Sequence, residues 1–202
     1  MAAKPIKDID NLVLGGKWNI FIFTPEWMKD NFFGETKLNI DFIVPNGAIT
    51  FKSEDIAIIV SSESIRLRAL RYNGTVFKKL ITILRTIVRL LAQTPVSGFG
   101  VNFKYDLGDE VADFFKNLQF SGKSINKEER RWAIDDSSSK MILNLMLTKI
   151  KSQTTIDFNY HYPIENCAEL ASIIEDDAFV CMKQNESISE LREFFNIQAE
   201  QL

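Results

Sequence analysis

The chain has 202 residues, of which 46% are hydrophobic and 25% charged, an ordinary composition for a globular protein with one sizeable core. The formal net charge of −3 excludes a generally basic protein that coats nucleic acid. No stretch reaches the roughly 20 apolar residues that span a bilayer, and the N-terminus lacks the apolar core of an export signal. We therefore expect a cytoplasmic protein that does not cross a membrane, with Cys167 and Cys181 as free thiols.

The first expected elements are an irregular lead-in, a strand and a short helix. Residues 1–16 end in Gly15-Gly16 and predict a loose lead-in. Residues 17–23 (Lys-Trp-Asn-Ile-Phe-Ile-Phe) predict a buried strand. Thr24 followed by Pro25 is typical of a helix start, and we expect this helix to end at Gly34.

An antiparallel meander should follow. Residues 36–44 and 48–52 predict strands on either side of Pro45-Asn46-Gly47, a turn signal because Asn-Gly tolerates positive φ. Residues 55–61 and 64–71 predict two further strands.

The strongest pattern predicts a helix over residues 75–93. Its polar side chains fall within one third of the circumference, and the remaining two thirds are apolar. So wide an apolar face indicates a helix that packs deeply against a sheet. Thr94-Pro95 ends the helix, and residues 96–105 predict a strand. The helix residues that we expect to be buried are Leu80, Ile83, Leu84, Ile87, Val88 and Leu91.

The second half begins with a predicted helix over 109–118 and a polar loop over 119–127, the best candidate for a subdomain boundary. A helix opens at Pro163, and Ser187 with Glu190 forms a capping-box pattern that predicts the start of a last helix. Between the loop and Pro163, a second meander is predicted, with strands over 128–136, 140–150 and 154–162.

Together these elements predict an α+β fold: a mainly antiparallel sheet of two meanders, with a long helix and C-terminal helices packed on it. We expect an N-terminal α+β half, residues 1–118, that carries the basic helix. A C-terminal half, residues 128–202, should carry the second meander and the acidic helices, and the two halves should share one core.

Motifs for catalysis and metal binding are sparse. Gly15-Gly16 lacks the spacing of a phosphate-binding loop, and a single histidine excludes two-histidine metal sites, so we expect no cofactor and no metal. Strand alternation places His161 on one face with Asp157 and Asn159, with about 13 Å between positions i and i+4. An enzyme whose site is assembled around His161, Asp157 and Lys104 is one alternative hypothesis.

Charge is segregated along the chain, since no acid lies between Glu63 and Asp106, whereas acids dominate residues 163–202. The predicted helix carries a basic stripe, and the preceding strand adds two arginines. A nucleic-acid-binding module that uses this helix is a second alternative, although the exposed aromatic residues that single-strand binders use are missing between the charges. The basic residues concerned are Lys78, Arg85, Arg89, Arg66 and Arg68.

The basic stripe could instead pair with acids of the C-terminal segment. Arg85 and Arg89 of one copy could face Glu190 and Glu193 of a second copy, which would contribute to a homodimer. The same contacts within one chain would form an intramolecular clamp and leave the protein monomeric.

The passage Thr94-Pro95-Val96-Ser97-Gly98-Phe99-Gly100-Val101-Asn102-Phe103 resembles a sporadically distributed family of uncharacterised bacterial proteins. In that family an apolar helix similarly runs into a Thr-Pro-Val strand that carries Gly-x-Asn-Phe, and the Asp157-Phe158-Asn159 strand before a C-terminal helix agrees with it. The resemblance implies a bacterial or phage source and brings no established activity with it.

The leading hypothesis is a non-enzymatic protein–protein interaction module, a profile that fits a bacterial or phage defence-related component. No catalytic constellation stands out, whereas charge segregation and 16 phenylalanines supply surfaces for a protein partner or for self-association.

Overall fold

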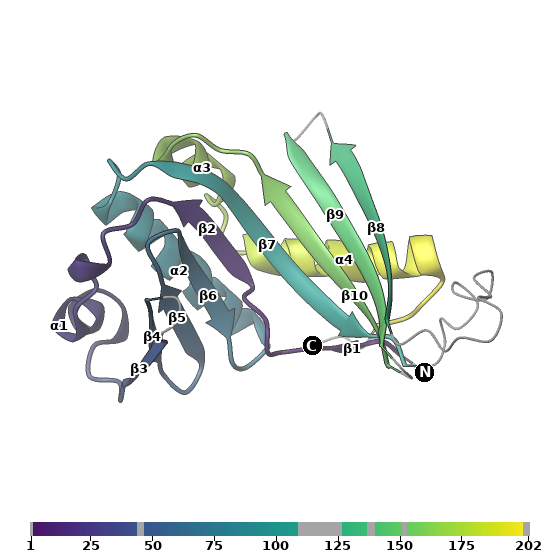
Figure 1. Ribbon diagram of the computed structural model, residues 1–202, viewed down its shortest axis with the longest axis horizontal. Coiled ribbons are helices and arrows are strands. Elements are labelled where there is room, and N and C mark those ends of the chain that lie inside the picture. Colours follow the sequence, from purple (N-terminus) through teal and green to yellow (C-terminus); the bar gives the residue numbers. More distant parts are fainter. Residues whose placement is uncertain (1, 44–46, 109–126, 137–139, 151–152, 200–202) are drawn as a thin grey trace.

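The computed structural model describes residues 2–43, 47–108, 127–136, 140–150 and 153–199. In this part of the chain one 10-stranded sheet forms, in the order β3-β4-β5-β6-β2-β7-β10-β9-β8, with β1 also paired to β7 (Figure 1). Every pair of named strands is antiparallel, which confirms the predicted α+β class. The strands are β1 (Lys4–Pro5), β2 (Leu12–Gly16), β3 (Asn39–Ile43), β4 (Ala48–Lys52), β5 (Ile56–Val60), β6 (Ser64–Ala69), β7 (Val96–Asp106), β8 (Lys127–Asp136), β9 (Met141–Ile150) and β10 (Gln153–Tyr162).

The main helices, α2 (Gly74–Leu90), α3 (Cys167–Ile173) and α4 (Phe179–Phe195), lie on one side of the sheet, behind the strands in Figure 1. Strand alternation sends Ile156, Phe158 and Tyr160 of β10 into the core on that side. The core therefore lies between the sheet and the helices. The opposite side of the sheet, called here the open face, carries half-buried polar residues such as Asp157 and Asn159.

Residues from both predicted halves belong to one core. Its buried cluster includes Leu84 and Phe103 from the first half and Leu145 and Phe158 from the second. The predicted helix over 109–118 lies outside the described residues, as does the predicted loop up to residue 126. No helix in the described part of the chain combines the length and the apolar character needed to cross a membrane.

The N-terminal segment differs from the prediction. Leu12–Gly16 is a strand between β6 and β7, although residues 1–16 were expected to be irregular. A Cβ at Gly16 would lie 2.6 Å from the Pro95 carbonyl oxygen, so glycine permits the close approach of the two chains. The predicted strand over 17–23 is also wrong. Its second part is a 3-10 turn, η1 (Ile20–Ile22), which begins where the Asn19 side chain accepts a hydrogen bond from the Phe21 N–H.

The short helix begins and ends where the sequence predicts. The Trp27 N–H donates to Thr24 Oγ1 at 3.2 Å, which makes Thr24 the N-cap of α1 (Pro25–Met28). The chain continues as a π-helical turn, η2 (Lys29–Phe33), and leaves it at Gly34 with φ of 54°. Phe23, Met28 and Phe33 of this region are buried in the common core.

The long helix α2 matches the prediction closely. Its N-cap is Asn73, whose side chain accepts a hydrogen bond from the Val76 N–H at 2.9 Å. The helix ends at Leu90 rather than Gln93, and Leu91 is half-buried rather than buried. The other residues expected in the core are buried: Leu80, Ile83, Leu84, Ile87 and Val88.

The C-terminal helices begin at other residues than predicted. The first is α3, which starts at Cys167 after the N-cap Asn166 rather than at Pro163. Ser187 and Glu190 lie inside α4, so the predicted capping box is wrong. The Ser187 hydroxyl is buried, lies 2.6 Å from the Tyr105 hydroxyl and donates to the Gln184 carbonyl, and it is therefore unavailable as a cap.

Candidate functional site

Arg85, at the centre of the predicted basic stripe, binds the loop between α3 and α4 of its own chain. Its Nε donates to the Ile174 carbonyl oxygen at 2.7 Å, and its other nitrogens bond the Glu175 carbonyl and the Asp177 carboxylate. The guanidinium thereby satisfies carbonyls that the end of α3 leaves unpaired. Arg85 forms an intramolecular clamp, while Lys78 and Arg89 are exposed along the same helix.

Replacing Arg85 by methionine should therefore destabilise the protein. We expect the free energy of unfolding to fall by about 1–2 kcal/mol, because the Ile174 and Glu175 carbonyls lose a charged donor. The control Arg89→Met changes an exposed arginine on the same helix and should alter stability by less than about 0.5 kcal/mol. Equal denaturation midpoints for the two variants would contradict the clamp.

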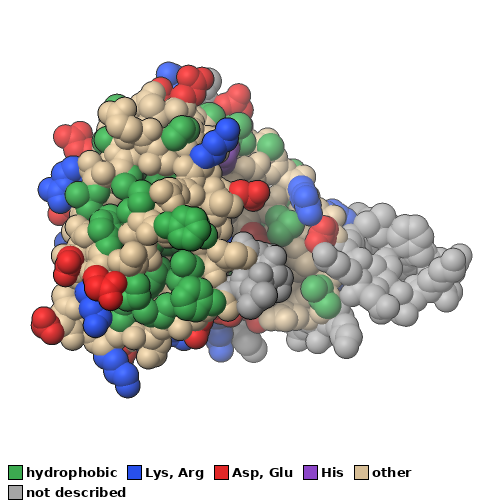
Figure 2. Space-filling view, turned by 60° about the vertical axis from the view of Figure 1, so that its left-hand side comes forward, with side chains coloured by type: hydrophobic (Ala, Val, Ile, Leu, Met, Phe, Trp, Pro, Cys, Tyr) green, Lys and Arg blue, Asp and Glu red, His purple; other side chains and the backbone are tan. Residues whose placement is uncertain are grey.

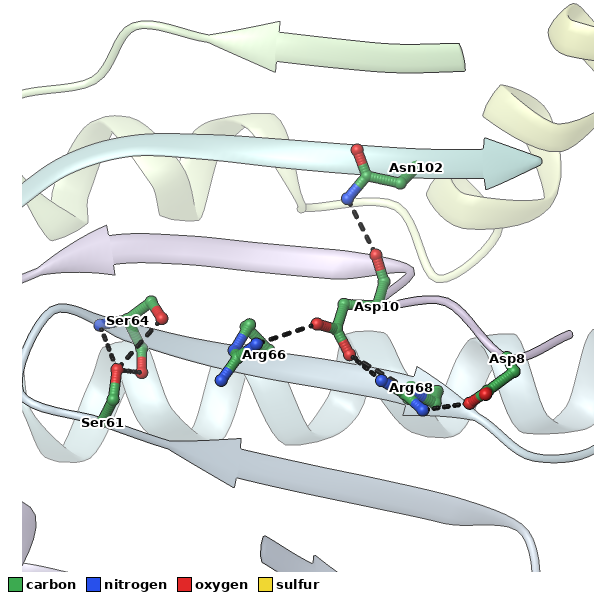
Figure 3. A network of polar contacts seen from close by, with 7 residues as sticks. All are labelled: Asp8, Asp10, Ser61, Ser64, Arg66, Arg68 and Asn102. Carbon is green, nitrogen blue, oxygen red and sulfur yellow. Dashed lines mark hydrogen bonds and ion pairs between the residues drawn. The ribbon is translucent and has the colours of Figure 1, made fainter. Parts of the chain in front are cut away.

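Arg66 and Arg68 project from β6 onto the open face, whereas Ile65 and Leu67, which alternate with them, point into the core. Both arginines bind Asp10, at 3.3 Å and 2.9 Å, and Arg68 also bonds Asp8 (Figure 3). They are therefore neutralised within the chain. The structure does not bring them together with Lys78, Arg85 and Arg89, because α2 packs on the other side of the sheet.

Of the two predicted acidic partners, Glu190 is half-buried and Glu193 is exposed on α4. The Tyr160 hydroxyl donates to the Glu190 carboxylate at 2.7 Å. Burial raises the pKa of Glu190, the hydrogen bond from Tyr160 opposes this shift, and Glu186 adds to it. Glu190 thus has a partner in its own chain, as Arg85 does.

The raised pKa of Glu190 predicts a pH dependence of stability. The folded chain holds the Glu190 proton more tightly than the unfolded chain. The protonated carboxyl therefore contributes its full stabilisation of the fold below the ordinary pKa of 4.5, and this contribution is lost as the pH rises through the raised pKa of the folded state. Glu190→Gln keeps an acceptor for Tyr160 and removes the titration. We expect the variant to gain stability relative to the wild type between acidic and neutral pH, as measured by urea denaturation. A difference in stability between the two proteins that stays constant across this pH range would contradict the raised pKa of Glu190.

The residues of the enzyme hypothesis share the open face, but Asp157 does not contact His161 for general-base chemistry. Asp157 pairs with Lys104 of β7 at 3.0 Å. The His161 ring lies close to Gly98, where a Cβ would be 3.0 Å from Cε1. Among the described residues no three His, Cys, Asp or Glu side chains gather as metal ligands.

Three asparagines form a ladder across the open face. The Asn144 amide donates to Asn159 at 3.0 Å, Asn159 donates to Asn102 at 2.6 Å, and Asn102 donates to the Asp10 carbonyl at 2.8 Å. The last of these contacts appears in Figure 3. Because each amide is used by its neighbour, this part of the open face is a structural polar network that links β9, β10, β7 and the start of β2.

Both cysteines are free thiols, as expected. Cys167 is buried near the Leu91 and Thr94 carbonyls, and burial raises its pKa. A thiol with a raised pKa is a weak nucleophile at neutral pH, so Cys167 is not suited to covalent catalysis.

The structure has an exposed apolar surface at one end of the sheet, which the sequence analysis did not predict. The side chains of Phe21 on η1 and Phe42 on β3 are 84% and 71% exposed, and Ile22 lies beside Phe21. Figure 2 brings this end of the molecule forward and shows hydrophobic side chains gathered on it. We call Phe21, Ile22, Ile40 and Phe42 the β3-edge patch. Three of these residues, Phe21, Ile40 and Phe42, border a hollow of about 190 Å³, which is also lined by Ile20, Phe23, Thr24, Pro25, Ile49 and Phe51.

The β3-edge patch coincides with an open edge of the sheet. Among the described strands β3 has a neighbour on one side, β4, and β8 ends the sheet on the other side. The strand β8 carries charged residues along its length, such as Glu129, Arg131 and Asp135, and such a pattern discourages pairing with a further strand. Asp41 is the one charged residue in the sequence of β3. Strand alternation predicts that Ile40 and Phe42 face the core side, but the sequence does not reveal that β3 lies at the edge.

Searches with the sequence do not place the chain in a known group. No protein-family model matches it, and a search among curated proteins finds no significant match.

Proposed function

We propose that this protein is a non-enzymatic protein-binding module whose contact surface is the β3-edge patch. The observation that carries the proposal is the exposure of two phenylalanines, Phe21 and Phe42, beside a strand whose outer edge has no partner among the described strands. Phenylalanine has no polar group to offset its contact with water, and clustered exposed aromatics mark interaction surfaces. The hollow of about 190 Å³ next to Phe42 would accept an apolar side chain of the partner.

The arrangement suits strand addition. The outer edge of β3 presents backbone N–H and C=O groups for main-chain hydrogen bonds, and Phe42 with Ile40 flanks them on one side. Main-chain pairing would supply part of the affinity, and burial of the aromatic rings would supply the rest at about 25 cal/mol per Å² of apolar surface. The other two functions have less support, because Arg85, Arg66, Arg68 and Asp157 all bind partners within the chain.

Capture of partners by the immobilised protein tests this proposal. Nuclease-treated lysate of the native host should yield proteins retained by the wild type and lost with Phe42→Asp. The matched control is Ile134→Asp, an exposed apolar residue on the opposite edge strand β8, which should retain the same proteins. Identical capture by both variants would refute the β3-edge patch as the contact surface, and recovery only without nuclease would point to nucleic acid instead.

A further inference from the structure

We propose, resting on the function above, that the partner at the β3-edge patch is a second copy of this chain. The two β3 strands pair antiparallel around a two-fold axis perpendicular to the sheet, so that two sheets become one continuous sheet. Both copies use the same surface in such a contact, and the outer edge of each β3 strand becomes hydrogen-bonded to the other.

Strand geometry limits the register of this pairing. A two-fold axis perpendicular to the sheet keeps each side chain on its own face, so one residue of β3 must lie opposite itself. Centring on Asp41 would place two carboxylates directly opposite each other, which is unfavourable. Centring on Asn39 would place Phe42 opposite Thr36, in a turn whose Thr36 N–H already donates to the Phe33 carbonyl.

Centring on Ile40 gives complementary pairs throughout. Ile40 lies opposite its own copy, and Phe42, which shares the face of Ile40, lies opposite Leu38, the residue before β3. On the open face Asn39 lies opposite Asp41, where the amide can donate to the carboxylate. Because of the two-fold symmetry, the Leu38–Phe42 pair and the Asn39–Asp41 pair each occur twice in the dimer. This register covers Phe42, the one aromatic residue of β3, which is 71% exposed.

The composition of the two edges supports a second copy at β3 rather than at β8. The β8 edge carries several charges of both signs, including Glu129, Arg130 and Arg131, and would have to desolvate them on pairing. The β3 edge would desolvate one carboxylate, Asp41, which meets an amide. The contact is short, because β3 has five residues, so a reversible dimer in the micromolar range or weaker is expected.

Sedimentation equilibrium over a series of concentrations tests the dimer. The wild type should rise from the monomer mass of 23.2 kDa to twice that mass, Phe42→Asp should stay monomeric, and Ile134→Asp should behave as the wild type. Circular dichroism melts should show that both variants are folded, which is expected because both replaced side chains are exposed. A wild type that remains at the monomer mass throughout, or a dimer equally strong in Phe42→Asp, overturns the inference.

Cysteine cross-linking tests the register, with Cys181→Ser as the background and Cys167 buried. Asn39→Cys and Asp41→Cys replace exposed residues on the open face. Mixing the two variants under oxidation should give a disulfide-linked dimer, and neither alone should cross-link efficiently, because only the mixed pair lies directly opposite. Efficient cross-linking of Asp41→Cys or of Asn39→Cys alone overturns the register.

The two proposals can fail separately. If the wild type is monomeric and still captures other proteins through Phe42, the self-pairing is wrong and the protein-binding function stands. If neither self-association nor capture depends on Phe42, both are wrong.

Discussion

Replacing Ile87 by alanine should lower the free energy of unfolding by about 2–5 kcal/mol. Ile87 lies on the buried face of α2 and is 0% exposed. The helix packs its apolar face on the sheet, close to β6, and the interior cannot collapse fully around the lost atoms. Leu84→Ala, one turn earlier in the same core, should cost a similar amount.

Chemical denaturation, followed by circular dichroism, measures this effect as a shift of the midpoint at unchanged slope. The control Lys78→Ala alters an exposed position of the same helix and should change stability by less than about 0.5 kcal/mol. Unchanged midpoints in both Ile87→Ala and Leu84→Ala would show that α2 does not pack as described.

Replacing Asn11 by alanine should cost about 2–4 kcal/mol, which is unusual for one polar residue. Its side chain is 0% exposed and has three partners: Oδ1 accepts from the Ala69 N–H at 2.9 Å, and Nδ2 donates to the Tyr72 hydroxyl at 2.7 Å and to the Asn102 carbonyl at 3.4 Å. Alanine would leave the Ala69 and Tyr72 groups buried without these bonds, and each costs about 1–3 kcal/mol. Burial also raises the pKa of Tyr72 to about 12.

The matched control is Asn39→Ala, an asparagine on a strand with an exposed side chain, which should be nearly neutral in the monomer. Tyr72→Phe should cost less than Asn11→Ala, because it removes the two bonds of the Tyr72 hydroxyl but leaves the buried Ala69 N–H with its acceptor. Thermal or urea unfolding of the three variants ranks them by the loss of stability that each substitution causes. If Asn11→Ala were as stable as Asn39→Ala, the buried asparagine would have no structural role.

Contacts between the basic and acidic segments occur within the chain in this structure. Arg85 binds Asp177 and two carbonyls before it, and Glu190 binds Tyr160. The expected pairing of Arg85 and Arg89 with Glu190 and Glu193 across a dimer would have to compete with these contacts. Self-association at the β3 edge avoids this conflict, because none of these residues belongs to the β3-edge patch.

Local sequence signals determined those elements whose evidence lies within a few residues. The helix α2 follows from an apolar period repeated over 17 residues with Asn73 as its N-cap, and α1 follows from Thr24 and Pro25. The strands β3 to β7 and β8 to β10 follow from alternation and turn signals, so their approximate ranges, and with them the α+β class, could be predicted. Strand alternation also predicted that His161 and Asp157 share a face.

The same local signals misled where a distant partner decides the conformation. The five residues of β2 form a strand because β6 and β7 lie on either side of them, and Gly16 permits contact with a carbonyl far along the chain. Ser187 and Glu190 match a helix start in spacing, but α4 begins earlier, at Phe179. Their side chains form hydrogen bonds with Tyr105 and Tyr160 instead.

The sequence by itself therefore determined most of the helical and extended segments, although not β2 or the turn at Ile20–Ile22, and it determined which side chains of a strand share a face. Tertiary structure alone decided which charges are neutralised and which apolar residues stay in water. Asp10 meets Arg66 from 56 positions away, so a basic residue in the sequence is not a basic surface in the fold. Phe42 alternates like a core residue, yet it is 71% exposed, because the order of strands along the described sheet leaves β3 at its edge. Burial depends on which elements become neighbours, and local periodicity carries no information about that choice.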